Sequence, residues 1–481
     1  MPRMETPPTP MKDEADPVAV AAADPEAAPS SPASSPPPGL SDDGAAAMPT
    51  WRRWVILAVV CWMSLPMTLM STSIMVATPE IARDLGTAPT AISTINAYVF
   101  LAMAASPLLW QPLAVFLGRR TTYLSGAVVL ALGSLGCALA DGTPALTAMW
   151  VLSGTTGPLF LVFGQTILSD IFEPTVRGTA VGFFLGSSVS AQSIAPLIGS
   201  VIATFSTWRV IFGVQGVMTV IGFALAFAFV PRARDLAGTA QAPTKPWTVA
   251  NVRAAVNPLI VLRFFSYPGI LLGNVSCGLL AMNQYGILSS VRHIINPRFG
   301  FDSPLTGGLF YLAPGLGFLI GSLSGGRISD AVVKRWIVRR GGARLPEDRL
   351  KATLPMIFGI LPLGTLLYGW SVDHKIGGLG LPISAAFIQG FGLMASFSGL
   401  NTYAAESYPE FKQAVIGSKY IAQYLFGAAS VASTIRIIDS VGVGWAFSIS
   451  AFECIFGGVL VSIITFMLVR KPGGTPRTFC S

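Results

Sequence analysis

The sequence predicts an all-α membrane protein with twelve transmembrane helices. Of its 481 residues, 52% are hydrophobic and 11% are charged, whereas soluble domains carry roughly 25% charged residues. Apolar windows long enough to cross a hydrocarbon core of about 30 Å recur along the chain. The basic residues also concentrate in alternate connections between these windows, as in multi-pass membrane proteins. This composition argues against a large soluble enzyme.

Twelve apolar segments follow Trp54, and the longest interior break divides them into two sets of six. The expected spans are 54–77, 92–116, 122–140, 144–168, 179–204, 208–230, 264–289, 306–326, 352–371, 378–404, 413–437 and 444–469. We therefore expect two six-helix bundles joined by a linker and followed by a short tail. Their ranges are 51–230 for the first bundle, 231–263 for the linker, 264–470 for the second bundle and 471–481 for the tail.

Residues 1–50 differ from the rest of the chain, because they are rich in Pro, Ala and Ser with scattered acids. Such a segment buries too little apolar surface to order itself, so we expect a disordered cytosolic tail. It lacks the short apolar core after a basic start that marks a signal peptide. The five Cys and two His form no metal-binding spacing, so neither a metal nor another cofactor is expected.

The basic residues predict that both termini are cytosolic. With the N-terminus inside, six of the 31 Lys and Arg fall outside, which leaves 25 on the cytosolic side. The six are Arg83, Arg209, Arg292, Arg298, Lys375 and Arg436. Such a bias follows the positive-inside rule and favours an even number of helices. The net charge of +8 indicates contact with anionic lipid rather than with nucleic acid.

Matching basic hairpins occur in the two halves: "GRRTTYL" after the second span and "GGRISDAVVKRW" after the eighth. Such a parallel repeat is typical of major facilitator transporters. With "SDIFEPTVRGTAVG" and "WRVIF", the chain resembles the major facilitator superfamily, and within it the fungal drug:proton-antiporter-like branch. More narrowly, it resembles fungal exporters of itaconate. "GLFYLAPGLGFLIGSLSGG", "RLPEDRL", "GTLLYGW", "NTYAAE" and "IDSVGVGW" carry that similarity.

The resemblance implies a gate at the cytosolic hairpins. The family pattern after the second helix is Gly-x-x-x-Asp-Arg-x-Gly-Arg-Arg; here Gly118-Arg119-Arg120 is kept, while Gln111 and Val115 replace the first Gly and the acid. The second half keeps Asp330, with Lys334 and Arg335 closing its hairpin. We therefore expect Asp330 to latch the inner gate. Asp170, Glu173 and Arg177 lie in the next cytosolic connection, where the two acids are candidate partners of Arg119 and Arg120. Alternatively, these two arginines serve as topology anchors that contact lipid headgroups.

Lys419 is the main candidate for substrate binding. It lies about six residues, or roughly 9 Å, into the eleventh span, and Gln423 follows one turn later on the same face. An ammonium beside an amide can bind a carboxylate. The competing interpretation is that Lys419 snorkels to the cytosolic interface.

Other polar residues lie at membrane depth, where they form either a binding site or hydrogen bonds between helices. The further substrate-binding candidates are Asn283, Gln284, Tyr285, Asn401, Tyr403 and Tyr420. Glu453 in the twelfth span is the candidate for proton coupling, and Glu406 at the inner end of the tenth span is a second candidate. Arg292 and His293 are expected just past the seventh helix, as a loop or an exit vestibule for anions.

The sequence thus predicts a secondary transporter that exports a small dicarboxylate by alternating access, with itaconate as the substrate that the resemblance implies. An alternative is efflux of a secondary metabolite, glycolipid or drug, with or without proton coupling. A membrane receptor or scaffold is a third reading, and no enzymatic nucleophile or metal cluster is visible. The expected partners are an organic anion and the bilayer, not nucleic acid, for a monomer in the plasma membrane.

Overall fold

The structure, a computed structural model, describes residues 49–172, 174–230, 259–300, 303–342, 345–407 and 411–467. Within these ranges it is helical, without strands. The tail at 1–48, most of the linker (231–258) and the C-terminal residues 468–481 lie outside the described residues, and so do the predictions made for them.

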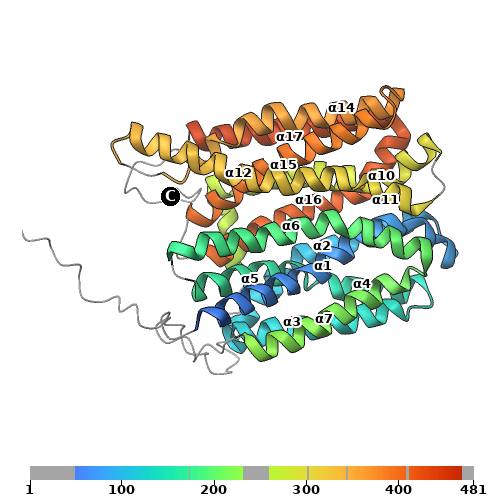
Figure 1. Ribbon diagram of the computed structural model, residues 1–481, viewed down its shortest axis with the longest axis horizontal. Coiled ribbons are helices and arrows are strands. Elements are labelled where there is room, and N and C mark those ends of the chain that lie inside the picture. Colours follow the sequence, from blue (N-terminus) through green and yellow to red (C-terminus); the bar gives the residue numbers. More distant parts are fainter. Residues whose placement is uncertain are drawn as a thin grey trace, which may run out of the picture. The chain divides into compact units, whose positions relative to one another are not determined.

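The first half of the chain folds into the helices in the lower part of Figure 1. They are α1 (Thr50–Asp84), α2 (Pro89–Leu117), α3 (Arg119–Ala138), α4 (Thr143–Gly154), α5 (Gly157–Ile171), α6 (Pro174–Phe205) and α7 (Arg209–Phe229). The α4 and α5 helices together form one membrane span that is interrupted before Pro158. Gly118, between α2 and α3, has a φ of +79°, a conformation in which glycine is favoured.

The second half forms the upper part of Figure 1. Its helices are α9 (Leu259–Leu262), η3 (Arg263–Ser266), α10 (Pro268–Phe299), α11 (Pro304–Phe310), α12 (Leu312–Arg339), α13 (Asp348–Lys351), the π-helical turn η4 (Met356–Ile360), α14 (Leu361–His374), α15 (Gly380–Ser407), α16 (Lys412–Val441) and α17 (Val443–Phe466). The first described residues after 231–258, from Leu259 onward, are therefore already helical, although they lie inside the segment expected to be a linker.

Eleven spans in the described residues are long and apolar enough to cross a membrane. The helix α10, with 32 residues, occupies the place of the seventh predicted span. Its many polar residues lower its mean hydropathy, so α10 is not counted among these eleven spans. Several helices run past their predicted ends: α1 continues from 77 to Asp84, and α10 continues from 289 to Phe299. Arg292 and His293 therefore lie within α10 rather than in a loop beyond it.

Tight helix packing holds the second half together along α12 and α15. A Cβ added to Gly317, Gly321 or Gly325 would lie 2.3–2.6 Å from backbone atoms of α15. These glycines recur every fourth residue and so share one face of α12. Small residues in this spacing let membrane helices approach closely, so the α12–α15 seam is a rigid contact.

The two halves meet along α2 and α16, and along α6 with α11 and α12. On α2, Phe100 makes edge-to-face ring contacts with Tyr285 and Tyr424 of the second half. Gln111 donates a hydrogen bond from Nε2 to the carbonyl oxygen of Gln413 at 3.2 Å. The residue that replaces the family's glycine therefore links the halves.

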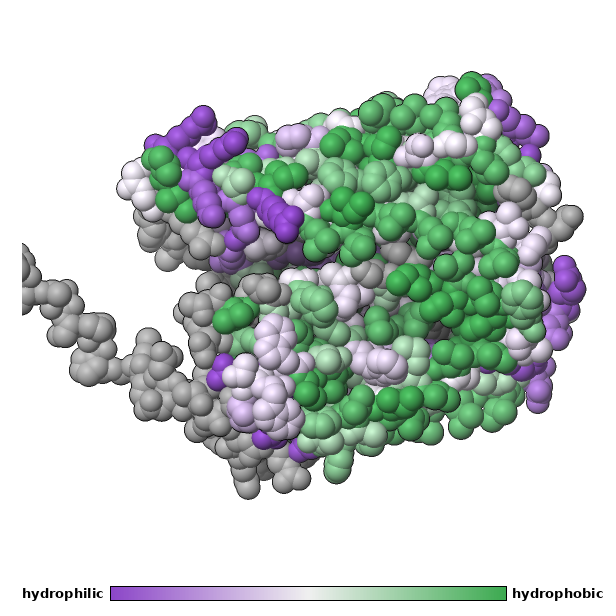
Figure 2. Space-filling view, in the orientation of Figure 1, coloured by the Kyte–Doolittle hydropathy of each residue, from purple (hydrophilic) through white to green (hydrophobic). Residues whose placement is uncertain are grey.

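The helix bundle has two ends with different charge. We call the end at which α1 begins the basic end, because Arg119, Arg120, Lys334 and Arg335 lie there. We call the end at which α1 finishes, at Asp84, the far end. In Figure 2 apolar residues cover the surface between the two ends, and hydrophilic residues gather at the ends themselves.

Candidate functional site

A cavity of about 700 Å³ lies between the two halves. The first half lines it with α1, α2, α5 and α6, and the second half with α10, α12, α13, α15 and α16. Asp330, Arg349 and Glu406 line it where α12, α13 and α15 reach the basic end. Figure 2 shows the hollow between the halves at that end. The cavity therefore opens at the basic end.

Lys419 is buried in the wall of this cavity, with 5% of its surface exposed. Its Nζ donates a hydrogen bond to Oδ1 of Asn401 at 3.0 Å and lies 3.6 Å from the centre of the Tyr420 ring. Among the residues that the structure describes, no carboxylate lies within ion-pair distance of Nζ. A buried ammonium is thus held by an amide oxygen and a ring face alone, although a buried cation normally has an anionic partner.

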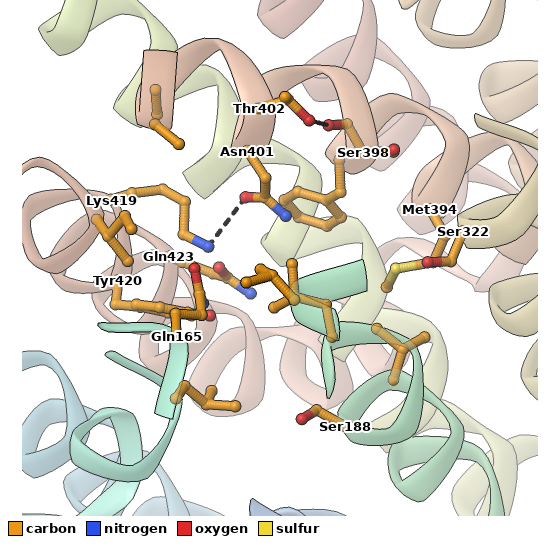
Figure 3. A pocket seen from close by; sticks show the side chains of 18 of the residues that line it. Gln165, Ser188, Ser322, Met394, Ser398, Asn401, Thr402, Lys419, Tyr420 and Gln423 are labelled. Carbon is orange, nitrogen blue, oxygen red and sulfur yellow. Dashed lines mark hydrogen bonds between the residues drawn. The ribbon is translucent and has the colours of Figure 1, made fainter. Parts of the chain in front are cut away.

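The helix α16 brings the other predicted groups to the same wall. Gln423 follows Lys419 by four residues, so both side chains face the cavity (Figure 3). Ser418 directly precedes Lys419 on α16, and its hydroxyl oxygen accepts a hydrogen bond at 3.0 Å from Nδ2 of Asn274 on α10. This contact fixes the rotation of α16 and therefore the direction of Lys419.

A second cavity of about 10 Å³ lies behind Lys419. Asn274, Cys277 and Tyr403 line it together with Lys419, and its volume is close to that of one water probe. Lys419 separates this small space from the main cavity.

The first half contributes uncharged polar groups to the cavity. Gln165 of α5 faces Gln423 and Tyr420 across the cavity (Figure 3). Gln192 of α6 accepts a hydrogen bond at 2.8 Å from Nε2 of Gln284 on α10, so this pair joins the two halves. The hydroxyl groups on this side belong to Ser64, Thr68, Ser71 and Ser188.

The mouth of the cavity carries a three-residue ionic cluster. Arg349 forms one ion pair with Asp330 at 2.8 Å and another with Glu406 at 2.8 Å, and 12% of the Arg349 side chain is exposed. All three residues belong to the second half. Asp330 therefore pairs within its own half here, rather than with basic residues of the first half as a closed inner gate would require.

The far end is joined by an ion pair between the halves. Arg292 Nη2 of α10 lies 2.5 Å from Glu80 Oε1 of α1, with side chains 13% and 20% exposed. Arg298 pairs with Asp373 nearby, within the second half. The Glu80–Arg292 pair therefore joins the two halves at the end opposite the cavity mouth.

Comparison with known proteins identifies the family. The sequence model of the Major Facilitator Superfamily matches residues 60–345. The chain belongs to the Major Facilitator Superfamily. It is a membrane transporter of the secondary type rather than an enzyme.

The transporter is similar to fungal proteins that are called efflux pumps. It is 26% identical over 427 residues to the efflux pump radE of Floropilus chiversii, which covers 84% of this chain and 78% of the relative. It is 25% identical over 438 residues to the efflux pump FUBT of Fusarium oxysporum, with 86% and 72% covered.

Solved structures of the superfamily share the fold. The xylose transporter XylE from E. coli, in a partially occluded inward-open conformation, matches with a TM-score of 0.65 and 14% identity over 89% of this chain and 100% of that one. The human organic anion transporter MFSD10 matches with a TM-score of 0.58 and 17% identity over 86% and 100%. At these identities the likeness concerns the fold alone.

Five predicted binding residues line the cavity of the transporter. They are Gln284, Asn401, Lys419, Tyr420 and Gln423. The structure brings these side chains from α10, α15 and α16 to one space.

Three other predicted binding residues do not line the main cavity. Asn283 bonds Thr365, Ser450 and Gln389 inside the second half. Tyr285 is buried against Phe100, with ring centres 4.6 Å apart. Tyr403 borders the small cavity. Neighbouring residues on a helix point about 100° apart, so the run Asn283-Gln284-Tyr285 spreads over about 200°, and only Gln284 of the three lines the cavity.

The predicted gating residues of the first half lie at the basic end. Arg119 forms an ion pair with Asp170, within the first half. Arg120 donates to the carbonyl oxygen of Phe227 and lies over its ring, with 5.4 Å to the ring centre. Glu173 and the side chain of Arg177 lie outside the described residues.

Two further predictions concern the second half. Lys334 and Arg335 are exposed on α12. Glu453, the coupling candidate, is half-buried on α17 and does not line the cavity. Among the described residues, no group of three His, Cys, Asp or Glu is placed to hold a metal ion.

Four residues at the cavity and at the far end were not predicted from the sequence: Gln165, Gln192, Arg349 and Glu80. Gln165 carried a signal, since it is an amide inside the apolar run 159–168. Glu80 was missed because the first helix was ended at residue 77.

Proposed function

We propose that the transporter exports a small organic carboxylate through the cavity at Lys419, with itaconate, a dicarboxylate, as the expected cargo. One observation carries the proposal: the buried Lys419 ammonium faces the cavity without a carboxylate partner among the described residues. Charged groups are costly to bury unless they are paired. An anionic substrate supplies the missing partner.

The groups around Lys419 fit a carboxylate. A carboxylate oxygen accepts a charge-assisted hydrogen bond from Nζ, while Gln423 and Gln165 present amide donors to the same region (Figure 3). Asn401 and the Tyr420 ring hold the ammonium in place by contacts that leave its charge uncompensated.

The relatives that are called efflux pumps support export as the direction of transport, and the topology that we propose gives cytosolic substrate a route to the site. The positive-inside rule assigns the basic end to the cytosol. The cavity then opens to the cytosol, and the Glu80–Arg292 pair closes the outer side. In this inward-open state cytosolic substrate reaches Lys419. Rocking of the two halves, with rupture of Glu80–Arg292, releases the substrate outside the plasma membrane.

A second candidate function is efflux of a larger amphiphilic compound. The apolar part of the cavity lining favours it, since Met67, Met103, Leu161, Leu185 and Phe397 all border the space. The relatives that are called efflux pumps point the same way. This function does not require the charge of Lys419.

Transport assays in inside-out membrane vesicles separate the two candidates. The test measures uptake of labelled itaconate and of a neutral amphiphile by the wild type, Lys419→Gln, Lys419→Arg and a far-end control, Lys375→Gln. A hydrogen bond to a charged group contributes about 1.5–3 kcal/mol, so we expect Lys419→Gln to lose roughly 10–100-fold of itaconate uptake. Lys419→Arg and Lys375→Gln are expected to retain it.

Two results would contradict the proposal. Absence of itaconate uptake by the wild type removes the cargo assignment. Neutral amphiphile uptake that is the same in wild type and Lys419→Gln, without anion uptake, establishes the second candidate instead.

A further inference from the structure

The charges that line the cavity are unevenly distributed between its mouth and its interior. Arg349 is neutralised by Asp330 and Glu406 at the mouth. Arg327 also lines the cavity, but it is exposed at the same mouth. Deeper in the cavity Lys419 is the cation that the described lining residues provide. The interior therefore offers one positive charge.

The rest of the polar lining is neutral. It consists of amide groups, of serine and threonine hydroxyls and of the tyrosines Tyr420 and Tyr424; the amides belong to Gln165, Gln192, Gln284, Asn401 and Gln423. Gln284 is 1% exposed, and its Oε1 has no hydrogen-bond partner, because the amide uses Nε2 to reach Gln192. Because this oxygen is buried beside the cavity, it becomes available to a neutral donor on the substrate, such as a hydroxyl, an amide or a protonated carboxyl, when the Gln192–Gln284 contact between the halves opens.

A second carboxylate would be poorly matched to this lining. Neutral amides donate hydrogen bonds but do not compensate a full charge, and an uncompensated charge is costly to remove from water. The unpaired oxygen of Gln284 also repels a carboxylate, whereas it accepts a hydrogen bond from the O–H group of the corresponding acid.

We infer, on the basis of the proposed function, that the transported species is a monoanion. One carboxylate binds Lys419, and the remainder of the substrate is uncharged and meets the amides of Gln192 and Gln284. A dicarboxylic acid is then carried in its half-protonated form, so that the second proton travels with the substrate. Lys419 then determines the specificity for one negative charge, and the amides of Gln192 and Gln284 determine the specificity for the uncharged end of the substrate.

Several groups near the site can themselves titrate or carry charge. Tyr420 and Tyr424 on α16 line the same cavity, Tyr403 on α15 and Cys277 on α10 border the space behind Lys419, and the mouth carries Arg327, Asp330, Arg349 and Glu406. A test that varies pH therefore needs a substrate whose own charge does not change.

The monomethyl ester of the dicarboxylic acid meets that need. Its single carboxylate stays ionised between about pH 5.5 and 8, because ordinary carboxyl groups titrate near pH 4. The purified full-length transporter in proteoliposomes is assayed with itaconate and with its monomethyl ester, at equal pH on both sides and without a voltage. We expect a flat profile for the ester. For the dicarboxylate we expect a fall of about tenfold per pH unit above its second pKa, as the half-protonated form disappears.

A variant with a second cation sharpens the test. Gln192 lines the cavity on α6 and is half-buried, so a lysine side chain at that position has room to enter the space. Gln192→Lys is expected to restore dicarboxylate transport at high pH and to flatten its profile, while Gln192→Leu keeps the steep fall. Each variant's dicarboxylate profile is compared with its own ester profile, because loss of the Gln192 amide is expected to lower the transport of both substrates.

The outcomes distinguish this inference from the function on which it rests. A dicarboxylate rate that stays constant above the second pKa in the wild type, beside a flat ester profile, shows that the dianion is carried and overturns the inference alone. Equal transport of ester and dicarboxylate by the wild type and Lys419→Gln overturns the proposed function itself.

Discussion

The two ends of the transporter use ion pairs in different ways. At the open basic end the ion pairs between described residues stay within one half: Arg119 pairs with Asp170 in the first, and Arg349 pairs with Asp330 in the second. At the far end Glu80 and Arg292 join one half to the other. Ion pairs within a half thus brace a rigid body, whereas a pair between the halves holds one end of the transporter together.

The far-end pair is suited to breaking as well as to forming. Each partner leaves one buried polar atom, Glu80 Oε2 and Arg292 Nη1, without a hydrogen bond. Unsatisfied buried groups cost free energy, so the closed far end is less stable than a fully bonded pair would make it. Opening lets water reach these atoms and recovers part of that cost.

The largest expected effect is that of Arg292→Ala. It leaves the carboxylate of Glu80 buried without its partner, which costs about 3 kcal/mol when the pair is largely buried. The equilibrium between the inward-open and outward-open states should therefore shift about 100-fold toward the outward-open state. The measurement uses a cysteine placed in the cavity by Ser322→Cys and a membrane-impermeant maleimide added at the basic end. The rate at which the maleimide labels this cysteine should be lower in Arg292→Ala than in the wild type.

The matched control for this prediction is Arg298→Ala, which breaks a pair at the same end but within the second half. It should leave labelling unchanged. The charge exchange Glu80→Arg with Arg292→Glu should recover part of the wild-type rate. Equal labelling of wild type and Arg292→Ala would mean that the pair does not hold the far end closed.

An intermediate effect is expected for Gly321→Ala in the α12–α15 seam. The new Cβ would lie 2.4 Å from the carbonyl oxygen of Phe391, and such overpacking costs about 1–3 kcal/mol. We expect a lower melting temperature in detergent with an unchanged labelling rate at Ser322→Cys, because the seam lies inside one half. Gly326→Ala is the control, since its nearest neighbour would be 3.7 Å away. A large change in labelling would show that the halves are not rigid.

The smallest effect is expected for Arg119→Gln. Its side chain and that of Asp170 are 32% and 23% exposed, and ion pairs near the surface contribute about 0–1 kcal/mol. Melting temperature and labelling should both stay close to wild type. A shift as large as that of Arg292→Ala would assign the gate to Arg119 instead.

The fold was largely predictable, because each membrane-spanning helix must carry its own apolar stretch. The ends of α1 and α10 were not. Glu80 and Arg292 lie beyond the predicted spans, and their polar character indicated a connection. Their mutual pairing across the halves allows both helices to continue, and no local pattern reveals a partner 212 residues away.

The site was predictable where a residue is costly in a membrane. Lys419 stood out for that reason, and Gln423 followed from helical spacing. Neutral residues gave a weaker signal. Asn283 and Gln284 are adjacent and similar, yet one serves packing within the second half and the other faces the cavity. The rotation of α10 against its neighbours makes this choice, and it depends on the packed structure.

Holding Lys419 with neutral partners has an electrical consequence. On the proposed cycle the empty binding site carries a charge of about +1 and the loaded site is neutral, so only the return of the empty carrier moves charge across the membrane. A cell interior at a negative potential draws that positive site inward, with about 2.3 kcal/mol per charge for each 100 mV. The membrane voltage then acts as the restoring force that resets the transporter toward the cytosol.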